Sequence, residues 1–239
     1  MRVFSFAHLS VLALAINLVA CGDSEPCIAK AAAMPTSAAT TLETAKAADA
    51  HAITREQVIS HYADIAHATF ADAHCTAQAL QVAVNAFVAA PSAQTQQAAK
   101  DAWLAARVPY MQSEVFRFGN PLVDEWEGQV NAWPLDEGLI DYVDGDYQYA
   151  LGNDGATANI IASQSIQVGE EKVDVSALTA ELLAGLNELG GSEANVATGY
   201  HAIEFLLWGQ DLNGTQPGAG ERSYTDYLTD ENCTGGNCE

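Results

Sequence analysis

Two side chains in the segment GYHAIEFLLWG, His201 and Glu204, have the types and the spacing of a metal-binding pair. Residues three apart lie on one face of a helix, so the imidazole and the carboxylate can approach the same point. Imidazole and carboxylate together are common ligands of transition-metal cations. The pattern alone is weak, because His61 and Asp64 have the same spacing.

The surroundings of the pair are more informative than its spacing. The predicted helix is apolar on nearly all sides, as buried helices are. An ionised carboxylate buried without a partner costs several kcal/mol. We therefore expect either a cation held by His201 and Glu204 or a buried ion pair that only fixes the register of packed helices. The apolar neighbours are Val196, Tyr200, Ile203, Phe205, Leu206, Leu207 and Trp208.

A second stripe of functional side chains runs along an earlier predicted helix: Trp103, Arg107, Tyr110, Glu114 and Arg117. Residues at this spacing line one helix face. We predict Glu114 as a third metal ligand, with Arg107 and Arg117 holding carboxylates through bidentate bonds and Tyr110 half-buried beside them. The alternative is a ladder of surface salt bridges.

The elements that must position these residues are predicted to be helices. Thr54 and Gln57 have the spacing of a capping box, and a long helix should follow and end before Pro91. Ser92 should cap a second helix, with a kink at Pro109 and its end at Gly119. The two helices should pack as an antiparallel pair.

The remainder is predicted to be less regular. Residues 120–155 form a long connection with one short helix after Pro134, and further helices are expected over about 176–189 and from Ser192 to Gly209. No segment alternates like a strand over a useful length. The predicted fold class is all-α, an up-and-down helical bundle with a long, partly irregular connection.

The N-terminal residues are predicted to export and anchor the chain. Residues 1–20 combine Arg2 with an apolar run of signal-peptide length, and the run ends in Leu-Val-Ala-Cys, which resembles a bacterial lipobox with Cys21 as the lipidated residue. An ordinary secretory signal is the alternative. Residues 21–52 are poor in large apolar side chains and should be a flexible tether to a domain that spans 53–239.

Charge and cysteine content limit the possible partners. The formal net charge of -22 excludes nucleic-acid binding. It also raises the local concentration of cations, although an acidic surface commonly serves solubility alone. Cys233 and Cys238, in CTGGNC, should form a disulfide in an oxidising compartment, whereas the pairing of Cys27 and Cys75 stays open.

Several motifs together resemble the imelysin family, also called insulin-cleaving membrane proteases, and within it the branch called iron-regulated protein A. They are G-x-H-x-x-E-x-x-L-W-G at 199–209, W-x-x-x-R-x-x-Y-x-x-x-E-x-F-R-F-G at 103–119, WPL at 133–135, IDY at 140–142, and the closing YTDY and CTGGNC. The resemblance implies helical bundles, an exported and often lipidated protein, a link to iron uptake, and a family domain that continues beyond residue 239.

The expected function is the binding of a transition-metal cation, iron or zinc, by a protein anchored to the cell envelope. The expected location is the periplasmic face of the outer membrane, with the membrane and iron-uptake components as partners. A metallopeptidase is the alternative, but a zinc peptidase needs three protein ligands and a base, and only His201 and Glu204 are in view. A structural or adhesive lipoprotein is the third possibility.

Overall fold

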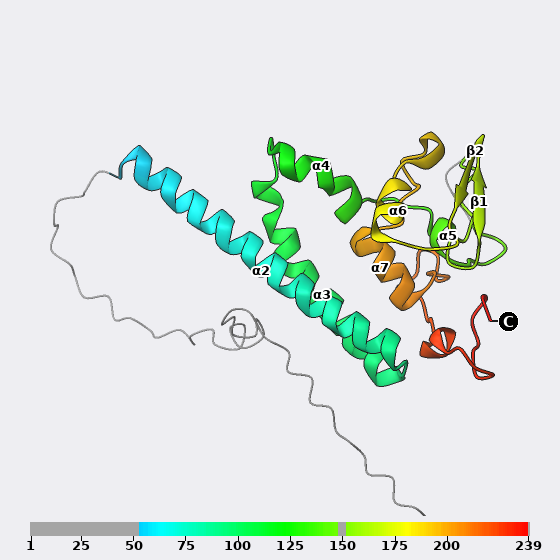
Figure 1. The fold of residues 1–239 in the computed structure, drawn as a ribbon. Coiled ribbons are helices and arrows are strands. Elements are labelled where there is room, and N and C mark those ends of the chain that lie inside the picture. The colour runs from blue at the N-terminus through cyan, green and yellow to red at the C-terminus, as the bar shows by residue number, and fades with distance from the viewer. Residues whose placement is uncertain (1–52, 148–151, 239) are drawn as a thin grey trace, which may run out of the picture. The chain divides into compact units, whose positions relative to one another are not determined.

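The computed structural model describes residues 53–147 and 152–238 (Figure 1). The predicted export signal (1–20) and tether (21–52), with the lipidation site Cys21, lie outside the described residues. None of the described helices is both long enough and apolar enough to cross a membrane.

Two long helices form the most regular part of the fold. Helix α2 (Arg55–Ala89) begins with the Thr54 capping box, and α3 (Ala93–Gln112) begins at the N-cap Ser92. The predicted pair of helices is confirmed, and α3 continues through Pro109 into the 3-10 turn η1 (Ser113–Phe116). The chain reverses between α2 and α3, and the Tyr62 and Phe116 rings meet edge to face near the other end of the pair.

The segment between α3 and the last helix is built from short elements. They are α4 (Pro121–Val130), α5 (Glu137–Ile140), β1 (Ser165–Val168), β2 (Glu171–Asp174), α6 (Ala180–Gly185) and the 3-10 turn η2 (Leu189–Gly191). Strands β1 and β2 pair antiparallel, with Ile166 opposite Val173. No strand of useful length was predicted, and among the described residues the structure adds only this hairpin of four-residue strands. The prediction of irregular chain over 121–130 was wrong, because α4 lies there. The helix predicted over 176–189 is reduced to the six residues of α6.

Helix α7 (Gly199–Trp208) carries the His201 and Glu204 pair and begins seven residues later than Ser192, its predicted cap. The residues just before α7 are part of the core and do not form a helix. Asn195 is fully buried, and its side-chain amide donates to the Leu189 carbonyl and accepts from Asn153. The chain ends with the 3-10 turn η3 (Tyr224–Tyr227) and the loop after it.

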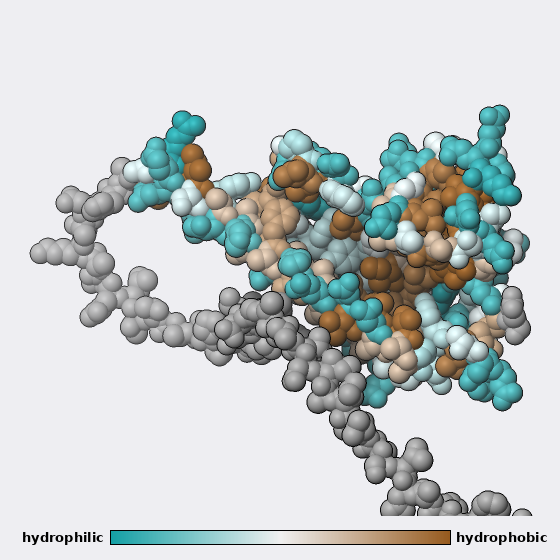
Figure 2. All heavy atoms as spheres, viewed as in Figure 1, coloured by the Kyte–Doolittle hydropathy of each residue, from teal (hydrophilic) through white to brown (hydrophobic). Residues whose placement is uncertain are grey.

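Two apolar cores meet at α7. The first is largely aliphatic and gathers side chains from α5, the β hairpin, α6 and one side of α7. The second is largely aromatic and gathers side chains from α2, α3 and the other side of α7. Figure 2 shows apolar side chains concentrated where α7 lies between the other elements. The all-α class is confirmed, with one small hairpin added.

Candidate functional site

Glycines fix both ends of the helix that carries the site. Gly199 has a φ of +85°, and a Cβ there would lie 2.4 Å from the Gln129 carbonyl oxygen at the end of α4. Gly209 has a φ of +77°, and its N–H donates to the Phe205 carbonyl to close the last turn. Only glycine allows both the left-handed backbone and the close approach of α4 to α7.

Two side chains of α3 hold the backbone of α7. The Trp103 indole N–H donates to the Tyr200 carbonyl at 2.9 Å, at the start of α7. The Gln96 amide donates to the Leu207 carbonyl at 3.2 Å, near its end, and to the Arg222 carbonyl at 2.8 Å. The position of α7 along α3 is therefore set by directional contacts as well as by apolar packing.

His201 and Glu204 are in direct contact. His201 Nδ1 and Glu204 Oε2 are 3.0 Å apart, and the Trp133 ring lies against the imidazole with the ring centroids 4.7 Å apart. The His201 side chain is 18% exposed and the Glu204 side chain 43% exposed. The carboxylate is thus less buried than the apolar helix led us to expect, because it lies on the edge of α7 that neither core covers.

The sequence did not identify Glu137, at the start of α5, as a neighbour of this pair. Glu137 is half-buried, and its backbone N–H donates to the Tyr147 hydroxyl at 2.8 Å. Burial, followed by the nearby carboxylates of Glu204 and Asp211, raises the pKa of Glu137 to about 7, and Arg222 opposes the shift. Its position beside α7 follows from the contact between α5 and α7, which no local sequence signal contains.

Glu114, the predicted third ligand, is not brought to the pair. It lies on η1 with its side chain 62% exposed and 3.9 Å from an Arg117 nitrogen. Arg117 donates to Glu127 and, at 3.0 Å, to the Tyr110 hydroxyl. Arg107 lies over aromatic rings and donates to Asn131, so it holds an amide and not a carboxylate.

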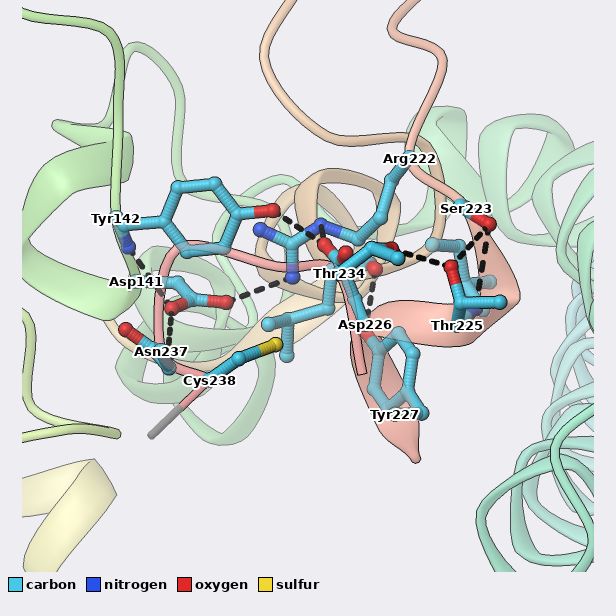
Figure 3. A network of polar contacts seen from close by, with 12 residues as sticks. Asp141, Tyr142, Arg222, Ser223, Thr225, Asp226, Tyr227, Thr234, Asn237 and Cys238 are labelled. Atoms are coloured by element: carbon cyan, nitrogen blue, oxygen red, sulfur yellow. Dashed lines mark hydrogen bonds and ion pairs between the residues drawn. The ribbon is translucent and has the colours of Figure 1, made fainter. Parts of the chain in front are cut away.

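A buried polar network around Arg222, which also lies over the Phe205 ring of α7, fastens the C-terminal segment (Figure 3). Arg222 Nη1 lies 2.7 Å from Asp141 Oδ2, with both side chains about 5% exposed, and the Asn237 amide donates to the other Asp141 oxygen. The Tyr142 hydroxyl donates to Asp226, which lies 3.6 Å from Arg222 Nε. These contacts hold Arg222 in a buried position from which its charge lowers the pKa of Glu137.

A disulfide adds to the constraint on the C-terminal segment, and a second one involves α2. Cys233 and Cys238 are joined, with their Cα atoms 5.8 Å apart. Cys75 on α2 is also disulfide-bonded.

The chemistry open to the site follows from the hydrogen bond between His201 and Glu204. In the tautomer with the proton on Nδ1, that N–H donates to the Glu204 carboxylate, and the neutral ring has its lone pair on Nε2. This is the arrangement in which a carboxylate orients a metal-binding histidine. Within 53–147 and 152–238, however, no three His, Cys, Asp or Glu side chains lie close enough together to hold a metal ion. The described residues therefore supply a pair of donors with acidic neighbours, and no complete metal cage.

Comparison with protein families supports the resemblance found in the sequence. The model of the family described as imelysin matches residues 66–239, which include His201, Glu204, Glu137 and Glu114. No curated protein matches the chain.

Proposed function

We propose, from the premise that this chain belongs to the imelysin family, that it is an exported, lipid-anchored protein that binds a transition-metal cation. The binding group would be His201 Nε2, with Glu204 orienting the ring and Glu137 replacing Glu114 as the further carboxylate. The contact between His201 and Glu204 carries the proposal. By resemblance to the iron-regulated branch, the process served would be iron uptake or homeostasis.

The charges around the pair support a cation as the ligand. Glu137, Glu204 and Asp211 interact as like charges, and the burial of Glu137 strengthens the repulsion between them. A cation would offset this repulsion, and the net charge of -22 would concentrate cations near the surface. The coordination shell of the cation would be completed by one further ligating side chain that moves toward it, or by a donor atom of a bound molecule.

The disulfides support export. A disulfide between Cys233 and Cys238 and a further one at Cys75 are stable in oxidising compartments and rare in the bacterial cytosol. Periplasmic or cell-surface placement provides such conditions. The anchor itself rests on the sequence at Cys21, and the iron-uptake components are proposed partners.

The direct test is calorimetric titration of the full chain with Zn²⁺ and with Fe³⁺ in a weakly coordinating buffer. His201→Ala should weaken binding at least about 100-fold, because the only imidazole of the pair is lost. Glu204→Gln should weaken it about 10- to 100-fold, as changes of an orienting carboxylate do. His67→Ala, an exposed histidine on α2, is the matched control and should leave the affinity unchanged. Equal affinities for the wild type and His201→Ala would contradict the proposal.

A metallopeptidase is the second candidate, and the family match is the observation that favours it. Hydrolysis on zinc needs an open water position as well as three protein ligands, and the described residues bring only His201 and Glu204 into contact. We expect no cleavage of peptide substrates by this chain. Cleavage that disappears in Glu204→Gln, with the fold retained, would make the peptidase the better assignment.

The lipid anchor can be tested separately. Replacement of Cys21 by alanine should abolish incorporation of labelled fatty acid and release the protein from the membrane fraction, because Cys21 is the predicted acylated residue. Cys27→Ala, a cysteine in the predicted tether, is the matched control and should remain lipidated. Persistent labelling of the Cys21→Ala protein would refute the assignment.

A further inference from the structure

A groove of about 690 Å³ lies among α2, α4, α6 and α7, apart from the His201 and Glu204 pair. Its floor is formed by buried side chains of the aromatic core, Leu80 and Tyr200. Figure 1 shows that these four helices come from distant parts of the chain. A volume of this size is typical of sites for small molecules, which occupy about 300–1,000 Å³.

The walls of the groove carry no formal charge. No Asp, Glu, Lys or Arg lines it, although such residues make up 17% of the chain. The exposed surface of the lining is mostly apolar, and four of the lining residues are aromatic: Phe70, Tyr110, Trp126 and Tyr200. This combination favours an uncharged ligand with an apolar ring system.

The charges near the groove disfavour a cation, and its lining offers no Lys or Arg as a partner to an anion. The Arg107 guanidinium lies 5.1 Å from the centre of the Tyr200 ring and 5.7 Å from that of Tyr110, and Arg117 lies 4.8 Å from the Tyr110 ring. A cationic ligand on these rings would meet two arginine charges. An anionic ligand would find no Lys or Arg among the lining residues to pair with, and the net charge of -22 would oppose its approach from solution.

Small residues give the groove its depth. Ala73 and Ala77 lie one turn apart on α2, and Ala180 and Ala184 lie one turn apart on α6. Larger side chains at these positions would occupy the space between the two helices. Three polar residues of α2 at the rim, His74, Gln81 and Asn85, are exposed and can bond a polar atom at one end of a ligand.

We propose that this groove is a binding site for a neutral, ring-containing apolar small molecule, held between the aromatic side chains of α3, α4 and α7 and the alanine wall of α2. It is independent of the proposed cation site, because none of its lining residues is His201, Glu204 or Glu137.

The test uses two dyes that share one ring system. N-phenyl-1-naphthylamine is neutral, and 1-anilinonaphthalene-8-sulfonate adds one negative charge. In fluorescence titrations of the full chain, the neutral dye should saturate at one equivalent, and the sulfonate should bind at least about tenfold more weakly. Ala77→Phe and Ala184→Phe fill the groove from opposite walls, and each should weaken binding of the neutral dye at least about tenfold.

The control places the same bulk outside the groove. Ala71 is exposed on α2 and does not line the groove, so Ala71→Phe should bind the neutral dye like the wild type. Circular dichroism and thermal unfolding establish that each variant is folded, and two filling variants guard against the failure of one. Neutral-dye binding that exceeds one equivalent, or that survives both filling variants, would overturn the proposal.

A different occupant would also be recognised. If the groove receives a second copy of the chain, sedimentation velocity should show a dimer that Ala77→Phe dissociates, and the dimer should exclude the dye. That result would overturn the small-molecule site. Equal affinity for the two dyes would likewise refute the argument from uncharged walls.

Discussion

The two sides of α7 are held by different kinds of contact. Toward α2 and α3, Tyr200 and Trp208 meet the Trp103 ring edge to face, and Trp103 also donates to the backbone of α7. Toward α5 and α6, Phe205 packs in an aliphatic core of fully buried side chains such as Leu139. The first side depends on the orientation of each group, and the second depends on filled volume.

This difference indicates how the candidate site is kept in place. Directional contacts fix where α7 lies along α3, while close packing supplies most of the stabilising burial. His201 and Glu204 stand on the edge between the two sides, so they can be exposed without loosening the helix. The following predictions separate the two contributions, beginning with the largest effect.

Truncation on the aliphatic side should have the largest effect. Phe205 is 3% exposed, and Phe205→Ala should lower the free energy of unfolding by about 3–5 kcal/mol, because a cavity replaces the ring. Urea unfolding followed by circular dichroism measures the change. Leu212→Ala, in an exposed residue of the following loop, is the control and should change it by less than about 0.5 kcal/mol. A loss below about 1 kcal/mol for Phe205→Ala would show that the aliphatic side is not closely packed.

The free energy of unfolding should depend on pH through Glu137, which interacts with Glu204 on the edge between the two sides. The pKa of Glu137 is raised to about 7 in the folded chain from an ordinary value of 4.5, so its contribution is fully present below pH 4.5 and is lost as pH rises through 7. With a discount for solvent screening, the loss should be about 1–2 kcal/mol relative to Glu137→Gln. Urea unfolding in the presence of a chelator, at pH 5 and pH 8, provides the comparison. The idea fails if both proteins have the same pH dependence.

The aromatic side should show the smallest effect. Trp103→Phe retains an aromatic ring but removes the donor to the Tyr200 carbonyl, and the free energy of unfolding should fall by about 1 kcal/mol. Amide hydrogen exchange should show α7 opening more often, because one of its directional contacts to α3 is gone. Trp126→Phe, in an exposed residue of α4, is the matched control. Unchanged amide exchange in α7 would show that packing alone holds the helix in its position.

The regular helices could be predicted because their boundary signals are local. Thr54 and Ser92 form the predicted caps, and Pro91 separates the two helices as expected. Helix α4 has comparable signals, the N-cap Asn120 and Pro121 at its first position. Its apolar residues Leu122, Trp126 and Val130 recur at a helical spacing of four, but the composition of residues 120–155, rich in Trp, Asp, Glu and Gly, led to the prediction of a loop.

The β hairpin was missed for a different reason. Its strands have four residues each, and only Ile166 and Val168 alternate as buried positions. Gly169 turns between the strands with a φ of +57°, but one glycine in a short segment is a weak signal. Tertiary packing decided the outcome, because the buried strand residues complete the aliphatic core.

The candidate site was predictable only as far as one helix extends. His201 and Glu204 could be paired from their spacing, and they are in contact. Glu137 and Glu114 could not be ranked, because each is brought to its place by contacts between elements far apart in the chain. Glu137 proved to be the acidic residue that interacts with Glu204, whereas Glu114 lies near Arg117.

The contact between α3 and α7 also has a consequence for the order of folding. Helices α2 and α3 are adjacent in sequence, whereas Gln96 and Leu207 are 111 residues apart when they meet. Closing a long loop reduces chain entropy before the contacts at its ends can compensate for the loss. The hairpin of α2 and α3 should therefore form well before α7 docks. The candidate site would then be among the last parts of the chain to become ordered, and a newly synthesised molecule would acquire it only after most of its secondary structure exists.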